Sequence, residues 1–257
     1  MSSFSRLLSL ALAASFFLSS AAICRAQVRQ YSLKVVAEYP HDPEAYTQGL
    51  FFKADTLCES TGQWGKSGFR KVDLETGKVF SRLNFSRKYF GEGSAVLDGR
   101  LYVLTWTSKV AFVYDAESLK FIKGYSYPRE GWGLTTDGNS LIASDGSSTL
   151  YWLDGDLRLL RSVNVRLGGR SVRYLNELEW IDGRIWANVY MTDTVLIINP
   201  DSGAVEGVVD CGGLLPAKLR TERTDVLNGI ARNPADGRIY LTGKNWPRLY
   251  EVKIVEK

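Results

Sequence analysis

Carboxylate, amide, lysine and aromatic side chains are the groups in this sequence that could carry out a reaction. Glu92 lies between Gly91 and Gly93, which let the backbone bend sharply and the carboxyl group point into a cavity. Aromatic surroundings would desolvate the charged carboxylate and raise its pKa toward the range that suits proton transfer near neutral pH. Lys244 follows a predicted strand and could reach the same cavity as a cation or hydrogen-bond donor. An exposed turn and a surface position are the alternative interpretations of Glu92 and Lys244.

Histidine-dependent chemistry is poorly supported. His41 is the only histidine of the chain, whereas a His-rich zinc site or a Ser–His–Asp triad needs histidine together with partners. His41 lies in Pro40-His41-Asp42-Pro43, a composition typical of a turn. We therefore expect no metal and no cofactor, and we assign His41 to a turn.

A repeated phrase positions these residues. Short runs rich in Val, Ile, Leu, Tyr and Trp recur between turn signals, which predicts strands, and almost no segment has helical periodicity. A Gly-apolar step, with Ser94 and Glu177 as its two departures, recurs at spacings of 40 to 52 residues: Gly49-Leu50, Gly93-Ser94, Gly133-Leu134, Glu177-Leu178 and Gly229-Ile230. The last four steps are each followed by an Asp-Gly pair that predicts a type I′ hairpin: Asp98-Gly99, Asp137-Gly138, Asp182-Gly183 and Asp236-Gly237.

A period of 40 to 50 residues that holds about four short strands is typical of propeller blades. The sequence therefore predicts an all-β fold, a five-bladed β-propeller that forms a single domain over residues 27–257. A β-sandwich with similar turn spacing is the alternative. In a propeller the segments that lead into the innermost strands meet at one mouth of the central channel. These segments are Tyr46-Thr47-Gln48, Phe90-Gly91-Glu92, Glu130-Gly131-Trp132, Tyr174-Leu175-Asn176 and Val226-Leu227-Asn228.

Aromatic walls with a few convergent polar groups predict a pocket for a small molecule or a peptide end. For each residue taken singly, packing within a blade explains its type as well. Arg173, Glu177 and Glu179 flank Asn176, and a structural ion-pair cluster accounts for them as well as catalysis does.

Several phrases, in this order, resemble the glutaminyl-peptide cyclotransferases of plant and bacterial type, from about Tyr39 to Val252. The phrases are Tyr46-Thr47-Gln48-Gly49-Leu50, Glu59-Ser60-Thr61-Gly62, Phe90-Gly91-Glu92-Gly93, Leu104-Thr105-Trp106, Gly131-Trp132-Gly133-Leu134, Ser144-Asp145-Gly146-Ser147, Leu175-Asn176-Glu177-Leu178-Glu179, Trp186-Ala187-Asn188-Val189 and Thr242-Gly243-Lys244. The resemblance implies a five-bladed propeller that converts the N-terminal glutamine of peptides or proteins to pyroglutamate and releases ammonia. It implies no metal, in contrast to the zinc-dependent animal enzymes.

The resemblance also implies site residues. Glu92, Asn176 and Lys244 carry over as catalytic residues, with Glu92 as general acid and base and with Asn176 or Lys244 holding the carbonyl oxygen. The expected substrate-binding residues are Tyr46, Gln48, Phe90, Trp106, Trp132 and Tyr190. Tyr46 stands where the family often has Phe, and Tyr190 where it commonly has Trp. Both changes keep an aromatic wall, so we expect activity to persist and substrate preference to shift.

Residues 1–26 have the order of a secretory signal peptide, with Arg6, an apolar run from Leu7 to Leu18 and small residues after it. This run is shorter than the roughly 20 apolar residues of a membrane span. We expect cleavage after Ala26, with cleavage near Ala22 as the alternative, and a third interpretation makes Cys24 the acylated residue of a lipoprotein. The mature chain is then exported, periplasmic or secreted, with no membrane association, and is expected to be a monomer.

The exported chain keeps two cysteines, Cys58 and Cys211, which form either a disulfide or two separate buried thiols. Loss of Arg6 and Arg25 lowers the formal net charge from +4 to +2, and basic residues are interspersed with Asp and Glu. We therefore expect no nucleic-acid partner. The alternative function is a non-catalytic propeller that binds peptide ends or partners.

Overall fold

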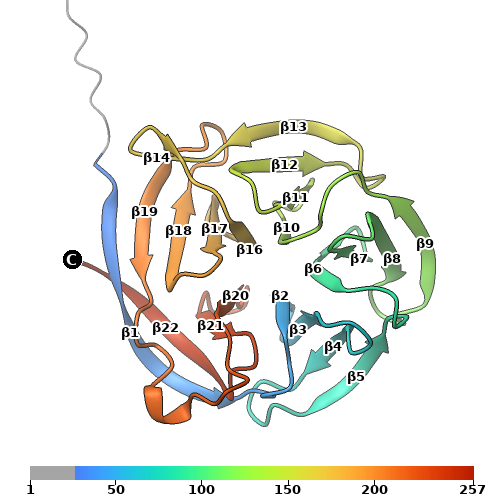
Figure 1. Ribbon diagram of the computed structural model, residues 1–257, viewed down its shortest axis with the longest axis horizontal. Helices are drawn as coiled ribbons and strands as arrows, with labels where there is room; N and C mark the ends of the chain where they lie inside the picture. The colour runs from blue at the N-terminus through green and yellow to red at the C-terminus, as the bar shows by residue number, and fades with distance from the viewer. Residues whose placement is uncertain (1–26) are drawn as a thin grey trace, which may run out of the picture.

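Strands account for nearly all regular structure in the computed structural model, which describes residues 27–257 (Figure 1). The predicted signal peptide, residues 1–26, lies outside the described residues. Within the described part of the chain, the single 3-10 helix is η1 (Ala217–Leu219), and the rest of the regular structure is β-strand. The expectation of an all-β chain is therefore confirmed.

Three antiparallel sheets of four strands follow one another along the first part of the chain. The first contains β2 (Thr47–Lys53), β3 (Thr56–Thr61), β4 (Gly68–Val72) and β5 (Val79–Asn84). The second contains β6 (Gly91–Leu97), β7 (Arg100–Thr105), β8 (Val110–Asp115) and β9 (Phe121–Ser126). The third contains β10 (Leu134–Thr136), β11 (Leu141–Ala143), β12 (Thr149–Leu153) and β13 (Leu159–Asn164), and a small hairpin of β14 (Arg166–Leu167) and β15 (Arg170–Ser171) follows.

The remaining strands form one sheet in the order β16-β17-β18-β19-β1-β22-β21-β20. They are β16 (Leu175–Ile181), β17 (Arg184–Val189), β18 (Thr194–Ile198), β19 (Val205–Asp210), β1 (Arg29–Pro40), β20 (Leu227–Arg232), β21 (Ile239–Gly243) and β22 (Arg248–Glu256). Strand β1 pairs antiparallel with β22, from Tyr31 opposite Glu256 to Pro40 opposite Arg248, and parallel with β19. The first and last strands of the described chain are therefore held side by side, as Figure 1 shows at the lower left.

The innermost strands β2, β6, β10, β16 and β20 surround the centre of the molecule (Figure 1). Each contacts the next around this ring, and β20 contacts β2. Apolar side chains pack between neighbouring sheets, as Leu104 of β7 does with Leu134, Leu141 and Leu153 of the third sheet. The fold is therefore propeller-like, with long-range contacts between sheets distributed around a common axis.

The start of most inner strands is irregular. The register shifts between Thr47 and Gly49, between Gly91 and Ser94, between Leu175 and Leu178, and between Leu227 and Ile230. The sequence predicted that the five converging segments precede the inner strands, whereas four of these strands begin at the second residue of their segment, two residues earlier than predicted. The segment that ends at Trp132 precedes β10, as predicted. A bulge re-aims a side chain relative to a regular strand, so Gln48, Glu92 and Asn176 lie at positions where this can happen.

The hairpin prediction is correct for two of the four Asp-Gly pairs. Asp98 and Gly99 have φ of 50° and 71°, Asp182 and Gly183 have 48° and 76°, and each pair joins adjacent strands as a two-residue loop. At Asp137-Gly138 and Asp236-Gly237 only the glycine has positive φ. Those loops are longer, since Thr136 pairs with Leu141 and Arg232 with Ile239.

The two cysteines are separate buried thiols. Cys58 packs with Phe69 and Leu101, whereas Cys211 packs with Leu214 and Trp246 in another cluster. Burial raises the pKa of each thiol to about 12. Of the two alternatives left open by the sequence, the structure has the one without a disulfide.

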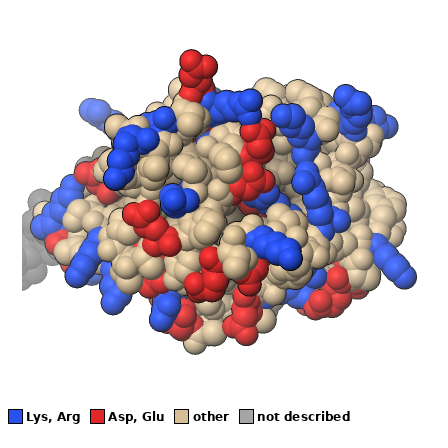
Figure 2. Space-filling model, turned by 90° about the horizontal axis from the view of Figure 1, so that it is seen from below, with Lys and Arg blue, Asp and Glu red and all other residues tan. Residues whose placement is uncertain are grey.

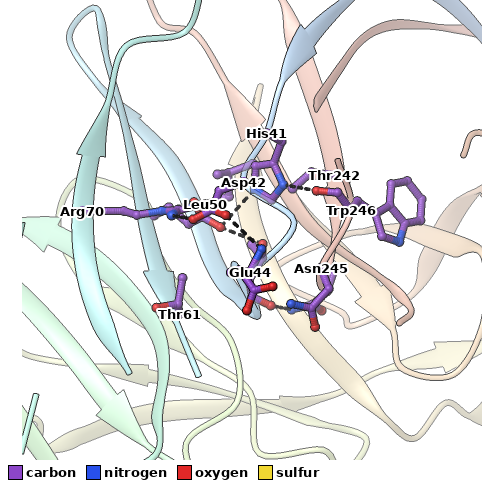
Figure 3. Close-up of polar contacts among 12 residues, drawn as sticks. His41, Asp42, Glu44, Leu50, Thr61, Arg70, Thr242, Asn245 and Trp246 are labelled. Atoms are coloured by element: carbon purple, nitrogen blue, oxygen red, sulfur yellow. Dashed lines mark hydrogen bonds and ion pairs between the residues drawn. The ribbon is translucent and has the colours of Figure 1, made fainter. Parts of the chain in front are cut away.

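His41 contributes to a buried polar network in addition to its place beside a turn, where the Ala45 N–H donates to the Asp42 carbonyl oxygen. Its Nδ1 lies 2.6 Å from the carbonyl oxygen of Trp246, and its Nε2 lies 3.2 Å from Oε1 of Glu59. Arg70 donates to Glu59 and, at 2.6 Å, to Asp42 (Figure 3). This network ties the segment before β2 to β3, β4 and the β21–β22 loop, which makes His41 a structural residue.

Charges of both signs are mixed on the face that Figure 2 shows, where Lys and Arg side chains are interspersed with Asp and Glu. Within residues 27–257, no helix has the length and apolar character needed to cross a membrane.

Candidate active site

One cavity of about 170 Å³ is lined by all the residues that the sequence analysis assigned to the site. They are Tyr46, Gln48, Phe90, Glu92, Trp106, Trp132, Asn176, Tyr190 and Lys244. Three polar members are the second residues of inner strands, Lys244 directly follows β21, and the aromatic members all lie in the adjoining loops. The fold therefore brings together residues that are spread over almost 200 positions of the chain.

Glu92 is 5% exposed, and its backbone carbonyl oxygen accepts a hydrogen bond from the Ser60 hydroxyl at 2.7 Å. Burial raises the pKa of its carboxyl group well above the ordinary value, Lys244 opposes this shift and Glu130 adds to it. Gly93 fits tightly behind Glu92, because a Cβ atom there would lie 2.5 Å from the Leu134 nitrogen. The site thus holds a carboxyl group that binds a proton more readily than an exposed glutamate does.

Lys244 is the buried cation of the cavity. Its Nζ lies 4.8 Å from the ring centroid of Tyr46 and 4.9 Å from that of Tyr190. Burial lowers its pKa, while Glu92 and Asp225 oppose the shift. The two aromatic faces attract the charged form, so the ammonium group is held inside the cavity as a donor.

Asn176 is fully buried, and its Oδ1 atom has no hydrogen-bond partner within residues 27–257. Its backbone carbonyl oxygen accepts from the Ser144 hydroxyl at 2.7 Å, which fixes the start of β16. An unpaired polar atom in a buried site costs free energy unless a ligand or water satisfies it. The Oδ1 atom of Asn176 therefore has acceptor capacity left for an N–H or O–H group of a ligand.

The aromatic rings form two walls. Phe90 contacts Tyr46 and Trp106 edge to face, with centroids 6.1 and 5.5 Å apart. Trp132 contacts Tyr190 in the same way at 5.6 Å. Edge-to-face contacts of this kind orient rings as well as bury area.

The sequence analysis did not assign three residues next to the cavity. Asp225 accepts a hydrogen bond from the Tyr46 hydroxyl at 2.9 Å, and Trp64 extends the wall of Phe90 with centroids 5.7 Å apart. Glu130 accepts hydrogen bonds from Trp106 and Trp132. Glu130 belongs to one of the converging segments, so the sequence pattern could have identified it as a neighbour of the site. Asp225 and Trp64 become neighbours of the site only through the packing of different sheets.

Glu177 and Glu179 do not form the ion-pair cluster considered for them. Within the described chain, no salt bridge joins Arg173 to either carboxyl group. Both groups are buried, and Glu177 accepts the backbone N–H groups of Leu50 and Ile230 at 3.2 and 2.8 Å. These two residues therefore belong to the packing of the inner strands.

The chain is similar to known proteins of one family. The sequence model of the glutamine cyclotransferase family matches residues 7–254. A glutaminyl-peptide cyclotransferase of Arabidopsis thaliana is 45% identical over 227 residues, which cover 86% of this chain and 71% of that protein. The crystal structure of Myxococcus xanthus glutaminyl cyclase superimposes with a TM-score of 0.83 at 36% identity, over 90% of this chain and 100% of the other.

No group of three or more His, Cys, Asp or Glu residues between positions 27 and 257 is arranged to hold a metal ion. The match to the family extends over the strands that build the cavity and over the residues that line it. This chain belongs to the glutamine cyclotransferase family.

Proposed function

We propose that the chain is a glutaminyl-peptide cyclotransferase, which converts the N-terminal glutamine of peptides or proteins to pyroglutamate with release of ammonia. The observation that carries the proposal is a buried carboxyl group, Glu92, in a small cavity walled by aromatic rings and shared with Lys244 and Asn176. Membership of the family and the similarity to two cyclotransferases support it.

The size of the cavity suits one residue. At about 170 Å³ it is below the roughly 300–1,000 Å³ of pockets for drug-sized ligands. The glutaminyl side chain and the α-amino group enter it, and the rest of the peptide lies outside.

The reaction is an intramolecular acyl transfer. The α-amino nitrogen attacks the γ-carboxamide carbon, and ionised Glu92 accepts a proton from that nitrogen. Protonated Glu92 then donates this proton to the departing nitrogen as the carbon–nitrogen bond breaks, so that one ammonia leaves and Glu92 returns to its ionised form. A general acid and base of this kind contributes about 10²–10⁴ in rate.

Lys244 and Asn176 support the tetrahedral intermediate. The ammonium group of Lys244, or the amide N–H of Asn176, donates to the carbonyl oxygen as it gains negative charge, a role that is worth roughly 3–4 kcal/mol for one donor. The aromatic walls hold the side chain bent, because a reaction between two groups of one molecule mainly requires orientation.

Ammonia release from a short peptide with N-terminal glutamine tests this function, with the N-acetylated peptide as control. We expect stoichiometric release from the free peptide, none from the acetylated one, and no loss of activity with a chelator. Binding of the free peptide without ammonia release by folded protein would contradict the proposal and would instead indicate a non-catalytic propeller.

We also propose a blade count and a cellular location. The sheet of eight strands corresponds to two blades, β16–β19 and β20–β22 with β1, which gives five blades in a single domain over residues 27–257. Residues 1–26 are a signal peptide of an exported, monomeric protein, periplasmic or secreted. Intact-mass measurement of the exported protein tests the cleavage: we expect a chain that begins at Gln27 and has lost one further ammonia, whereas retention of residues 1–26 would contradict it.

A further inference from the structure

Glu130 joins two walls of the cavity through one oxygen atom. Its Oε2 accepts the indole N–H of Trp106 at 3.0 Å and that of Trp132 at 3.1 Å. Trp106 follows β7 of the second sheet, and Trp132 precedes β10 of the third. A single carboxylate therefore sets the distance between indole edges that come from two different sheets.

The backbones of both tryptophans are fixed by other contacts. The Trp106 N–H donates to the Phe90 carbonyl oxygen at 3.0 Å, and the Trp132 carbonyl oxygen accepts from Gly93 at 2.7 Å. Gly131 between Glu130 and Trp132 has no space for a side chain, since a Cβ atom would lie 2.5 Å from Leu104. The backbone position of Glu130 beside the cavity is therefore fixed.

The ring of Trp106 has fewer constraints than the ring of Trp132. Trp106 is 37% exposed and touches Phe90 along one edge, while Trp132 is half-buried and touches Tyr190. Without an acceptor for its N–H group, the Trp106 indole could rotate about its side-chain bonds toward solvent, whereas the Trp132 indole is also packed against Gly146, where a Cβ atom would lie 2.6 Å from the ring. The bonds to Glu130 tie the Trp106 ring to the Trp132 ring in the orientation in which both line the cavity.

We propose that Glu130 is a positioning residue, which fixes the two tryptophan walls that hold the glutaminyl side chain in its cyclising conformation. This inference rests on the proposed function, because orientation of the side chain is what an intramolecular cyclisation requires. A displacement of about 1 Å in such a site can lower the rate by about 10²-fold.

Glu130 has a second, electrostatic influence on the site. Its negative charge adds to the burial that raises the pKa of Glu92, and the cation of Lys244 opposes both. The hydroxyl groups of Tyr46 and Tyr190 and the carboxylate of Asp225 are the other titratable groups around Glu92 and Lys244. Removal of the charge of Glu130 therefore lowers the pKa of Glu92.

Two substitutions separate these roles. In Glu130→Gln the amide oxygen can still accept both indole N–H groups, but the charge is lost. In Glu130→Ala both the acceptor and the charge are lost. Glu117→Ala, at a glutamate whose side chain is 79% exposed in the turn after β8, is the matched surface control.

We expect Glu130→Ala to lower kcat/KM by about 10²-fold and to reduce the near-ultraviolet circular dichroism of the indole rings. We expect Glu130→Gln to keep most of the dichroism and most of kcat, and to move the acidic limb of the kcat/KM profile to lower pH. Glu117→Ala should match the wild type in every measurement.

Two results would overturn the proposal. The first is a kcat/KM within twofold of wild type in Glu130→Ala. The second is an equal loss of activity in both Glu130 variants with no change in dichroism or pH profile. The dichroism of the free protein requires no turnover, so failure of this inference is distinguishable from a wild-type protein that releases no ammonia.

Discussion

At the scale of single residues, burial acts in opposite directions on the two ionisable groups that line the cavity. It raises the pKa of Glu92 and lowers that of Lys244, while the attraction between the two charges opposes both shifts. The two pKa values are thus shifted toward each other by burial and apart by the attraction between the charges. Loss of either charge should change the titration of the other.

Lys244→Met tests this coupling. Removal of the cation raises the pKa of Glu92 further, so the acidic limb of kcat/KM moves to higher pH, and loss of a donor lowers the maximal rate by about 10²-fold. The pH profile of ammonia release measures both effects. The same substitution at Lys66, whose side chain is 72% exposed, is the control and should leave the profile unchanged. An unshifted profile in Lys244→Met would contradict the coupling.

The sequence was sufficient to identify the residues that line the cavity, because they lie at repeated positions and in phrases that resemble a known family. It was insufficient for the residues that hold them in place. Asp225 and Trp64 have no distinctive spacing, and their roles follow from contacts with Tyr46 and Phe90 of other segments. Glu130 stood in a converging segment, yet its two indole partners could be recognised only from their geometry.

At the scale of elements, the inner strands approach one another so closely that some positions at or next to their first residues require glycine. A Cβ atom at position 133 would lie 2.0 Å from the carbonyl oxygen of Asn176, and both groups belong to the backbone of ordered segments. In β16 the corresponding position is occupied by Glu177 in place of glycine. Its two oxygens accept backbone N–H groups of β2 and β20, which follow register shifts in those strands.

Gly133→Ala should therefore displace Asn176 and lower both activity and stability. We expect a loss of roughly 1–3 kcal/mol in the free energy of unfolding, together with a fall in kcat/KM. Urea denaturation and the ammonia assay measure the two effects. Gly124→Ala in β9, where a Cβ atom would meet the Phe112 ring at 3.6 Å, is the control. Equal behaviour of the two variants would show that the close approach is unimportant.

Glu177→Gln should destabilise the inner strands. Both carboxyl oxygens accept N–H groups, so the amide nitrogen of glutamine would face another donor, at a cost of about 1–3 kcal/mol. Glu179→Gln is the matched control, since its amide oxygen can accept from the Arg232 N–H and its amide nitrogen can face the Thr135 hydroxyl. Urea denaturation at acidic pH compares them, and a smaller loss for Glu177→Gln than for Glu179→Gln would refute this account.

At the scale of the whole molecule, the pairing of β1 with β22 joins the two ends of the described chain within one sheet, and the network around His41 links that sheet to the sheet of β2–β5. Arg70 and His41 lower the pKa of the Glu59 carboxyl group in that network against the effect of burial. The sequence assigned His41 to a turn, whereas the turn follows it, with the Ala45 N–H donating to the Asp42 carbonyl oxygen, and His41 itself belongs to the buried network. The sequence could not indicate this network, because Trp246 and Arg70 reach His41 only after the sheets have assembled.

Stability should decrease as the pH rises toward 8 because of Glu179. Burial raises its pKa to about 8 in the folded state, from 4.5 for the ordinary group. The folded protein therefore binds more protons than the unfolded chain between these values, and the stabilisation is complete below about pH 4.5 and is lost as the pH rises through 8.

The free energy of unfolding of Glu179→Gln should lack this dependence. Its difference from wild type should change by a few kcal/mol between about pH 5 and pH 8, at about 1.4 kcal/mol per pKa unit. Urea denaturation at both pH values measures it. A difference that stays constant would contradict the raised pKa.

The most direct test of the whole account is ammonia release by Glu92→Gln from a peptide with N-terminal glutamine. Glutamine keeps the size of the side chain but cannot transfer the proton, so we predict a fall in kcat of about 10²-fold or more with an unchanged thermal unfolding midpoint. Glu179→Gln, which removes a buried carboxyl group outside the cavity, should keep kcat near that of the wild type. Retention of most of the wild-type activity by folded Glu92→Gln would contradict the assignment of Glu92 as the group that moves the proton.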